Sequence, residues 1–383
     1  MRYAIVTETY APEVNGVALT VAAKVAGLRE RGHEVDVIRP RQHAAQVAAA
    51  HELLTRGAPI PGYPGMRFGL PAHAALRRQW RRRRPDAIYI ATEGPLGWSA
   101  LRTALRMGIP VSSGFHTRFD EYMADYGLPF LQPLALAWMR RFHNRSRATL
   151  VPTCELSDFL RAQRFNDVYH LPRAVDTRRF DPQRRSQALR DAWGVAPDGL
   201  AAIYLGRIAA EKNLPLAVKA FRALQQRRPD ARFVWVGEGP ELARIRDANP
   251  DFVFCGLRHG EDLAAHFASA DMFIFPSHSE TFGNVTLESM ASGVATIAFR
   301  YGAAREHIEH RASGIAIAGK DEDAFVRAVV EVGCDDGLRR SLGEQGRIAV
   351  SKLRPAQVSA DFDDILQRIM HPGATRDVQP ALA

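Results

Sequence analysis

The sequence predicts an α/β protein made of two Rossmann-like, doubly wound domains that face each other across a central cleft. Three observations predict this class. At 383 residues the chain exceeds the size at which a single hydrophobic core stops growing. Short apolar runs alternate with amphipathic helical segments, as in βαβ units, and this rhythm occurs twice along the chain. Hydrophobic residues make up 46% and charged residues 24%, which is typical of a globular protein and excludes a disordered or fibrous one.

The first run of elements predicts a domain over residues 1–172, and the second run predicts a domain over residues 173–352. Strand-like segments of the first lie at 2–7, 34–38, 87–91, 110–114 and 149–152, with a helix at 18–31. Those of the second lie at 200–205, 232–236, 252–254, 272–275 and 295–299. Turn residues and charges interrupt the pattern at 172–182, which places the boundary there.

The C-terminal part of the chain is expected to be helical. Residues 353–370 predict one final amphipathic helix, because the apolar side chains gather on one face. These are Phe362, Ile365, Leu366 and Ile369. The tail at 371–383 is expected to be frayed.

The net charge of +9 is placed unevenly. The first 173 residues carry 24 Lys and Arg against 14 Asp and Glu, whereas the remainder is nearly balanced. A basic surface attracts nucleic acid, anionic lipid or phosphorylated substrates, and composition does not choose among them. Nucleic-acid binding is disfavoured, because the sequence has no recognisable binding module and no aromatic residues interleaved with the charge for base stacking.

Composition also restricts location and redox chemistry. No apolar run reaches the roughly 20 residues of a membrane-spanning helix, and Met1 leads directly into a strand-like segment, so we expect a cytoplasmic protein. The spacing of Cys154, Cys255 and Cys334 indicates neither a disulfide framework nor a zinc site. We expect these cysteines to be small buried hydrophobic residues.

The most specific motif is P-S-H-S-E-T-F-G-N-V-T-L-E-S-M at residues 276–290, directly after a predicted strand. It places Glu280 in a loop at the carboxyl end of that strand, where open α/β sheets bind ligands. Gly283 would let a ligand approach the backbone of the following helix, and Glu288 lies about one turn into it. Carboxylates suit sugar hydroxyls, since each accepts two hydrogen bonds. The alternative is a solvated Glu280 and a Glu288 that only complements the helix dipole.

Three further segments follow predicted strands. Arg207 and Lys212 come just after residues 200–205, where two cations fit a diphosphate or are simply exposed basic residues. His116 follows the strand at 110–114 and is expected at the edge of the cleft, although a lone His is often structural. The loop at 7–17, which contains Gly16, is not G-x-G-x-x-G, and Leu242 replaces the third glycine after Gly237, so a dinucleotide dehydrogenase is poorly supported.

The D-x-D spacings at 361–363 and 321–323 fall in helical or capping contexts rather than in a loop after a strand. A diphosphate bridged by a metal ion in the D-x-D manner is therefore not expected.

The chain resembles the retaining, nucleotide-sugar-dependent glycosyltransferases of family four, which have the GT-B fold, over nearly its whole length. The resemblance is carried by TETYAPEVNGVALT, GFHTRFDEYM, VDTRRFDP, LGRIAAEKNL and PSHSETFGNVTLESMASG. It is greatest to GDP-mannose-dependent α-mannosyltransferases and to lipid glycosyltransferases such as sulfoquinovosyl diacylglycerol synthases. One departure is the segment at 301–306, which reads Y-G-A-A-R-E where many relatives have Gly-Gly-Pro.

The resemblance implies a role for each matching residue. Glu280 would bind hydroxyls of the donor sugar, Glu288 the ribose, and His116 the sugar near the reacting carbon. Arg207 and Lys212 would bind the diphosphate. They would be assisted by backbone N–H groups of Phe282, Gly283, Asn284, Val285 and Gly16. Residues 1–172 would bind the acceptor and 173–352 the nucleotide sugar, and the last helix would cross back to the first domain. The donor is a substrate, so no cofactor and no metal are expected.

The implied reaction is transfer of a hexose, with mannose from GDP-mannose as the best hypothesis, to a lipid or glycan. The alternatives are a UDP-sugar-dependent synthase that glycosylates diacylglycerol, or a non-transferase of the same fold such as an epimerase. Arginine-rich stretches at 76–84 and 126–147, the second with Trp138, suit peripheral contact with an anionic membrane. A solvated face over an ordinary core stripe explains them equally well.

Overall fold

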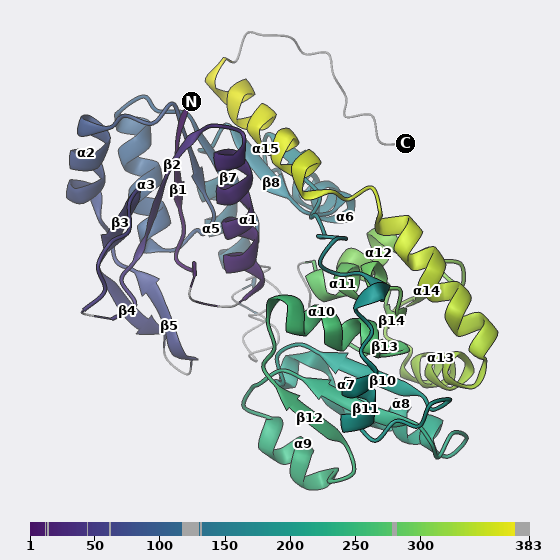
Figure 1. Ribbon diagram of the computed structural model, residues 1–383. Helices are drawn as coiled ribbons and strands as arrows, with labels where there is room; N and C mark the ends of the chain where they lie inside the picture. Colours follow the sequence, from purple (N-terminus) through teal and green to yellow (C-terminus); the bar gives the residue numbers. More distant parts are fainter. Residues whose placement is uncertain are drawn as a thin grey trace. The chain divides into compact units, whose positions relative to one another are not determined.

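The computed structural model divides the chain into two compact units (Figure 1). It describes residues 1–11, 13, 15–43, 45–60, 63–116, 130, 132–277 and 282–371. The first unit is Met1–Arg173 together with the segment that begins at Pro355, and the second is Ala174–Arg354. Each unit is an α/β structure with its own sheet and its own core on both faces of that sheet.

The sheet of the first unit has seven parallel strands in the order β3-β2-β1-β6-β7-β8-β9. Its strands are β1 (Arg2–Val6), β2 (Glu34–Pro40), β3 (Glu52–Thr55), β6 (Ala87–Ile90), β7 (Val111–Gly114), β8 (Ala148–Val151) and β9 (Val168–His170). A separate antiparallel pair is formed by β4 (Gly57–Ile60) and β5 (Tyr63–Gly69). The helices are α1 (Gly16–Glu30), α2 (His73–Arg82), α3 (Pro95–Arg106), α5 (Gln132–His143), α6 (Cys154–Ala162) and α15 (Pro355–Met370).

Alternate residues of β1 enter different cores, as a strand covered on both faces requires. Tyr3 and Ile5 pack with α1 and α15, whereas Ala4 and Val6 pack with α2 and α3. The apolar run that predicted this strand therefore reflects burial on both sides.

Helix α15 packs against α1, although the two are more than 300 residues apart in the sequence (Figure 1). The four apolar residues predicted to share a face are all buried in the first unit's core: Phe362, Ile365, Leu366 and Ile369. The helices approach closely at Gly27, where a Cβ atom would lie 2.0 Å from Oγ of Ser359. This confirms that the last helix returns to the first domain.

Asp363 links α15 to the rest of the first unit by hydrogen bonds. Its carboxylate is 1% exposed, and it accepts hydrogen bonds from Tyr3 Oη at 2.8 Å, His33 Nε2 at 2.9 Å and Arg31 Nε at 3.1 Å. Burial alone would raise the pKa of Asp363, but these hydrogen bonds hold it below its ordinary value. The acidic residue of this D-x-D spacing is therefore part of a buried structural network.

The sheet of the second unit has six parallel strands in the order β12-β11-β10-β13-β14-β15. They are β10 (Ala201–Leu205), β11 (Arg232–Val236), β12 (Val253–Gly256), β13 (Met272–Phe275), β14 (Ala295–Phe299) and β15 (Ile315–Ile317). Two 3-10 turns occur, η2 (Pro182–Arg184) and η3 (Ala210–Lys212). The helices are α7 (Gln187–Ala192), α8 (Leu214–Gln225), α9 (Leu242–Ala248), α10 (Gly260–Ser269), α11 (Asn284–Ala291), α12 (Gly302–His307), α13 (Glu322–Cys334) and α14 (Asp336–Val350).

Two parallel, doubly wound sheets confirm the predicted fold class. One expectation about the cysteines was wrong, because Cys154 and Cys334 are exposed and only Cys255 is partly buried. The first lies at the start of α6 and the second at the end of α13, where a helix turns toward solvent rather than into a core. Within the described residues, no helix is both long enough and apolar enough to cross a membrane.

Candidate functional site

The sheet of the second unit changes direction in strand order at β10. This strand pairs with β11 on one side and with β13 on the other, so the segments that leave β10 and β13 emerge next to each other at the carboxyl edge. Ligands of open α/β sheets bind at such a switch point. Arg207 and Lys212 lie on the segment after β10. The segment after β13 leads through Phe282 and Gly283 into α11, whereas Glu280 lies outside the described residues.

The segment after β10 is held in place by backbone contacts. Tyr204 Oη donates to the carbonyl oxygen of Arg207 at 2.9 Å, and Ile208 N–H donates to Glu238 C=O at 2.9 Å. Gly237 has φ +140°, and a Cβ atom there would lie 2.0 Å from the carbonyl oxygen of Gly206. Only glycine allows this approach, which explains the G-x-G spelling at 237–239 without a dinucleotide.

The segment after β10 carries two cationic side chains, Arg207 and Lys212. Arg207 is 44% exposed, and its guanidinium lies 3.9 Å from the carboxylate of Glu211. Lys212 ends the turn η3 and is half-buried. The ion pair with Glu211 is long and exposed to solvent, so it contributes little to stability.

Helix α11 begins at the same edge, and its N-cap residue makes no side-chain hydrogen bond to the first turn. Its N-cap is Gly283 in the left-handed region (φ +86°), and the first turn contains Asn284 and Val285. The carbonyl oxygen of Phe282 accepts a hydrogen bond from Ala303 N–H at 2.6 Å. A helix N-terminus carries a partial positive charge, and it favours phosphate oxygens.

The segment at 301–306, which lacks the Gly-Gly-Pro of many relatives, still packs closely against Phe282. Gly302 has φ +54°, and a Cβ atom there would lie 2.4 Å from the carbonyl oxygen of Phe282. Glycine is therefore needed at this one position, and the chain keeps it where Gly-Gly-Pro is lost.

Glu288 lies on α11 and is half-buried. Burial raises the pKa of Glu288 to about 7, and only the positive charge of Arg179 opposes that shift. A carboxylate destabilised in this way gains from hydrogen-bond donors such as ligand hydroxyls.

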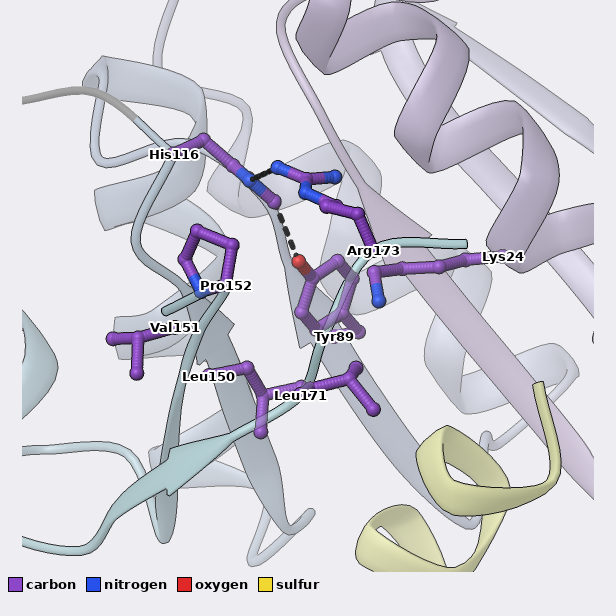
Figure 2. Close-up of a pocket in the computed structure, with 8 residues that line it drawn as sticks. All are labelled: Lys24, Tyr89, His116, Leu150, Val151, Pro152, Leu171 and Arg173. Carbon is purple, nitrogen blue, oxygen red and sulfur yellow. Dashed lines mark hydrogen bonds between the residues drawn. The ribbon is translucent and has the colours of Figure 1, made fainter. Parts of the chain in front are cut away.

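His116 lies in the first unit, at the carboxyl end of β7, and is 9% exposed (Figure 2). Its Nδ1 is 2.9 Å from Nη2 of Arg173, and its Nε2 is 2.7 Å from Oη of Tyr89. Burial, with the charges of Arg173 and Lys24, holds the pKa of His116 well below its ordinary range. Because arginine only donates, Nδ1 accepts, and the proton of the neutral ring lies on Nε2 and is donated to Tyr89.

Both ring nitrogens of His116 are therefore occupied within the first unit. A sugar hydroxyl would have to replace Arg173 or Tyr89, or use the backbone of His116. Gly114 makes room for this arrangement, because a Cβ atom there would lie 2.1 Å from Tyr89 Oη and 2.6 Å from His116 Nε2.

Gly16, the other expected site residue of this unit, is the first residue of α1 and is exposed. The side chain of Asn15 caps the helix by accepting from Val17 N–H at 3.1 Å and Ala18 N–H at 2.9 Å. Gly16 thus lies at the helix N-terminus, two residues earlier than the start predicted from the sequence.

The sequence did not predict the surroundings of His116, namely Tyr89, Arg173 and Lys24. Tyr89 is the third residue of β6, Arg173 lies three residues beyond β9, and Lys24 comes from α1. The available signal was partial, because only Arg173 follows the end of a strand.

Comparison with known proteins adds the family. Residues 14–179 match the model described as Glycosyltransferase Family 4, and residues 200–335 match that of Glycosyl transferases group 1. A GDP-mannose-dependent alpha-mannosyltransferase from Mycobacterium tuberculosis is 34% identical over 344 residues, which cover 87% of this chain and 88% of that protein.

Two further similarities extend over most of the chain. A GDP-mannose-dependent alpha-(1-6)-phosphatidylinositol dimannoside mannosyltransferase from Mycobacterium tuberculosis is 29% identical over 343 residues, covering 86% of this chain and 87% of that protein. The solved structure of a sucrose-phosphate synthase from Thermosynechococcus elongatus matches with a TM-score of 0.79 at 16% identity, covering 97% and 100% of the two chains. The chain therefore belongs to the family-four glycosyltransferases with the GT-B fold, and it is a glycosyltransferase.

Proposed function

We propose that the protein transfers mannose from GDP-mannose to a lipid acceptor. The observation that supports the donor half is the switch point of the second unit. There the segment with Arg207 and Lys212 and the segment that leads into α11 follow two neighbouring strands, β10 and β13. The names of the mannosyltransferases at 34% and 29% identity support GDP-mannose as the donor, and the second of these names supports a lipid acceptor.

The chemistry follows from the charges. Breaking the bond between the sugar and the diphosphate leaves negative charge on the leaving oxygen. Arg207, Lys212 and the first N–H groups of α11 would stabilise that charge, and loss of one such contact typically costs about 10²–10³ in rate. The Glu288 carboxylate would accept hydrogen bonds from the ribose, and Glu280 would bind the donor sugar. In this proposal the leaving group needs no metal ion, so a chelator is expected to leave turnover unchanged.

The test is the Lys212→Ala variant, measured by release of GDP from GDP-mannose that depends on added acceptor. We expect turnover to fall at least about 100-fold while the thermal unfolding curve stays the same. Lys219→Ala is the matched control, because Lys219 lies on α8 of the same unit in an exposed ion pair with Asp323. Near-normal turnover of Lys212→Ala would overturn the diphosphate assignment.

We also propose that α5 contacts an anionic membrane. Leu134 is 67% and Trp138 41% exposed, one turn apart on this helix, and Phe130 just before it is 72% exposed. Arg141 and Arg145 are exposed nearby, and each basic residue near an anionic surface is worth about 1 kcal/mol. An amphipathic surface with exposed aromatic and basic groups suits the membrane interface.

The arginine-rich helix α2 does not share this pattern, and its arginines are better explained as a solvated surface. Its apolar residues Leu76 and Trp80 are buried at 0% and 1% exposure, while its arginines face solvent. Here the pattern is a core stripe under a solvated face, so the membrane proposal rests on α5.

Vesicle flotation tests this proposal. The wild type is expected to float with vesicles rich in anionic lipid and not with neutral ones, and replacing Leu134 and Trp138 by serine should abolish flotation. Ile348→Ser is the control, since Ile348 is 62% exposed on α14 of the other unit. Equal failure to bind both kinds of vesicle would defeat the proposal.

A further inference from the structure

A small cavity lies in the first unit beside His116 (Figure 2). The cavity is partly open to solvent and has a volume of about 10 Å³, which is room for about one water-sized atom. Lys24 reaches in from α1, and Tyr89, His116 and Arg173 converge on it from the carboxyl edge of the sheet.

Lys24 is a buried amine without a counter-charge. It is 9% exposed, and among the described residues neither a carboxylate nor a hydrogen-bond acceptor pairs with its Nζ atom. The Nζ atom lies over two aromatic rings, 4.3 Å from the ring centroid of Phe362 and 5.7 Å from that of Tyr89. Burial, and then the charge of Arg173, lower the pKa of Lys24 well below its ordinary value.

Such a residue is costly for the protein. Burial without a counter-charge disfavours the ammonium form of this side chain, and two aromatic faces offset only a part of that cost. A methionine or leucine would fill the same space without the cost. The amine is therefore best explained by a ligand that supplies the missing negative charge.

The hydrogen-bond donors around the cavity point to the same kind of ligand. His116 donates its only N–H to the oxygen of Tyr89, so the hydroxyl hydrogen of Tyr89 is directed elsewhere. Lys24 brings up to three N–H donors. The rest of the lining is apolar, with Leu150 and Leu171 on its other side.

We propose that this cavity binds a phosphate group, with one phosphate oxygen in the cavity at Lys24 and Tyr89. The cavity has room for one oxygen atom, and the remainder of the group would lie on its open side. Lys24 and Arg173 together match a charge of up to two on the phosphate. The phosphate can be inorganic phosphate or belong to the headgroup of the acceptor lipid, and the second source rests on the proposed function.

The first test is thermal unfolding of the full chain in potassium phosphate and in potassium chloride of equal ionic strength. It is run in the Lys212→Ala background, which removes the response of the proposed diphosphate site. Phosphate at about 100 times its dissociation constant is expected to raise the unfolding midpoint by about 5 °C. Lys24→Met should lose this response, and without phosphate it should unfold at the same or a higher temperature than its parent, because it removes an unpaired buried charge.

Two results overturn the proposal: no specific stabilisation by phosphate, or a response that Lys24→Met retains. Tyr89→Phe gives a second measurement if Lys24→Met fails to fold, since it keeps the ring and removes the hydroxyl. Its apparent affinity for phosphate should fall at least about tenfold. An unchanged affinity in Tyr89→Phe would equally contradict the assigned oxygen position.

The source of the phosphate is distinguished by acceptor kinetics. With phosphatidylinositol as acceptor, Lys24→Met should raise KM at least about tenfold, and with diacylglycerol it should leave KM unchanged, if the lipid supplies the phosphate. Equal effects on both acceptors assign the site to inorganic phosphate. Absence of transfer to either lipid would contradict the proposed acceptor, while the phosphate-dependent unfolding would still decide the site.

Discussion

The buried carboxylate of Glu288 predicts a variant that is more stable than the wild type and poorer in donor binding. In Glu288→Gln the side chain keeps its shape and loses its charge. Burial raises the pKa of Glu288 to about 7 from an ordinary value of 4.5, and Arg179 offsets only a part of this. The folded protein thus bears a penalty whenever this carboxyl is ionised, and glutamine removes the penalty.

The magnitude and its pH window follow from proton linkage. At pH values below 4.5 the carboxyl is protonated in the folded and unfolded chain, and the charge contributes nothing. Between pH 4.5 and about 7 the unfolded chain has released the proton and the folded one still holds it, so wild-type stability falls as the pH rises. Each tenfold difference in proton affinity is worth about 1.36 kcal/mol, so the rise of the pKa from 4.5 to about 7 gives about 3 kcal/mol in favour of Glu288→Gln above pH 7.

The assay is urea denaturation of both proteins at pH 5 and at pH 8. Burial also raises the pKa of Glu8 to about 7, so the stability of both proteins falls as the pH rises for this second reason. The difference in unfolding free energy between the variant and the wild type cancels that contribution and reports on Glu288. Glu344→Gln, a change at an exposed position on α14, should stay within about 0.5 kcal/mol at both pH values. The reasoning would be refuted if Glu288→Gln differed from the wild type by the same unfolding free energy at pH 5 and pH 8, or if it were less stable than the wild type at pH 8.

Most of the strands that were predicted from the sequence are buried on both faces; the exception is β12, an edge strand whose four residues are half-buried. Residues 232–236, 272–275 and 295–299 coincide with β11, β13 and β14, and the helix predicted over 353–370 matches α15. Continuous apolar runs mark such strands even without an alternating pattern. The strands that were missed are mostly at the edges of the sheets: β3 and β9 end the first sheet and β15 ends the second.

The edge strands β3, β9 and β15 were missed for a physical reason. β3 has three half-buried residues out of four, and β9 and β15 have only three residues each. A short strand that is open on one side needs few apolar residues, so its sequence looks like a loop.

Some residues of the candidate site could also be placed from the sequence, and others could not. Arg207, Lys212 and the start of α11 could be predicted because each follows a predicted strand within a few residues. The cluster around His116 could not, because its members come from four segments far apart along the chain. The two basic stretches could not be told apart either, since Leu76 and Trp80 have the same four-residue spacing as Leu134 and Trp138, and only packing decides which pair is buried.

Two further substitutions test the packing on which the first unit depends. Gly114→Ala should lower the unfolding free energy by about 1–3 kcal/mol and turnover at least about tenfold, because the new methyl group would overlap Tyr89 Oη and His116 Nε2; wild-type values in both denaturation and turnover would contradict this. Asp363→Asn should cost about 1.5–3 kcal/mol in urea denaturation at pH 7, since Tyr3 and the partly exposed Arg31 would each lose a charged acceptor. The hydrogen bonds that hold the pKa of Asp363 below its ordinary value make this contribution present at neutral pH and lost as the pH falls through the folded-state pKa. The two proteins should therefore converge in stability on acidification, and a gap that stays constant down to acidic pH would show that Asp363 acts by packing and not by charge.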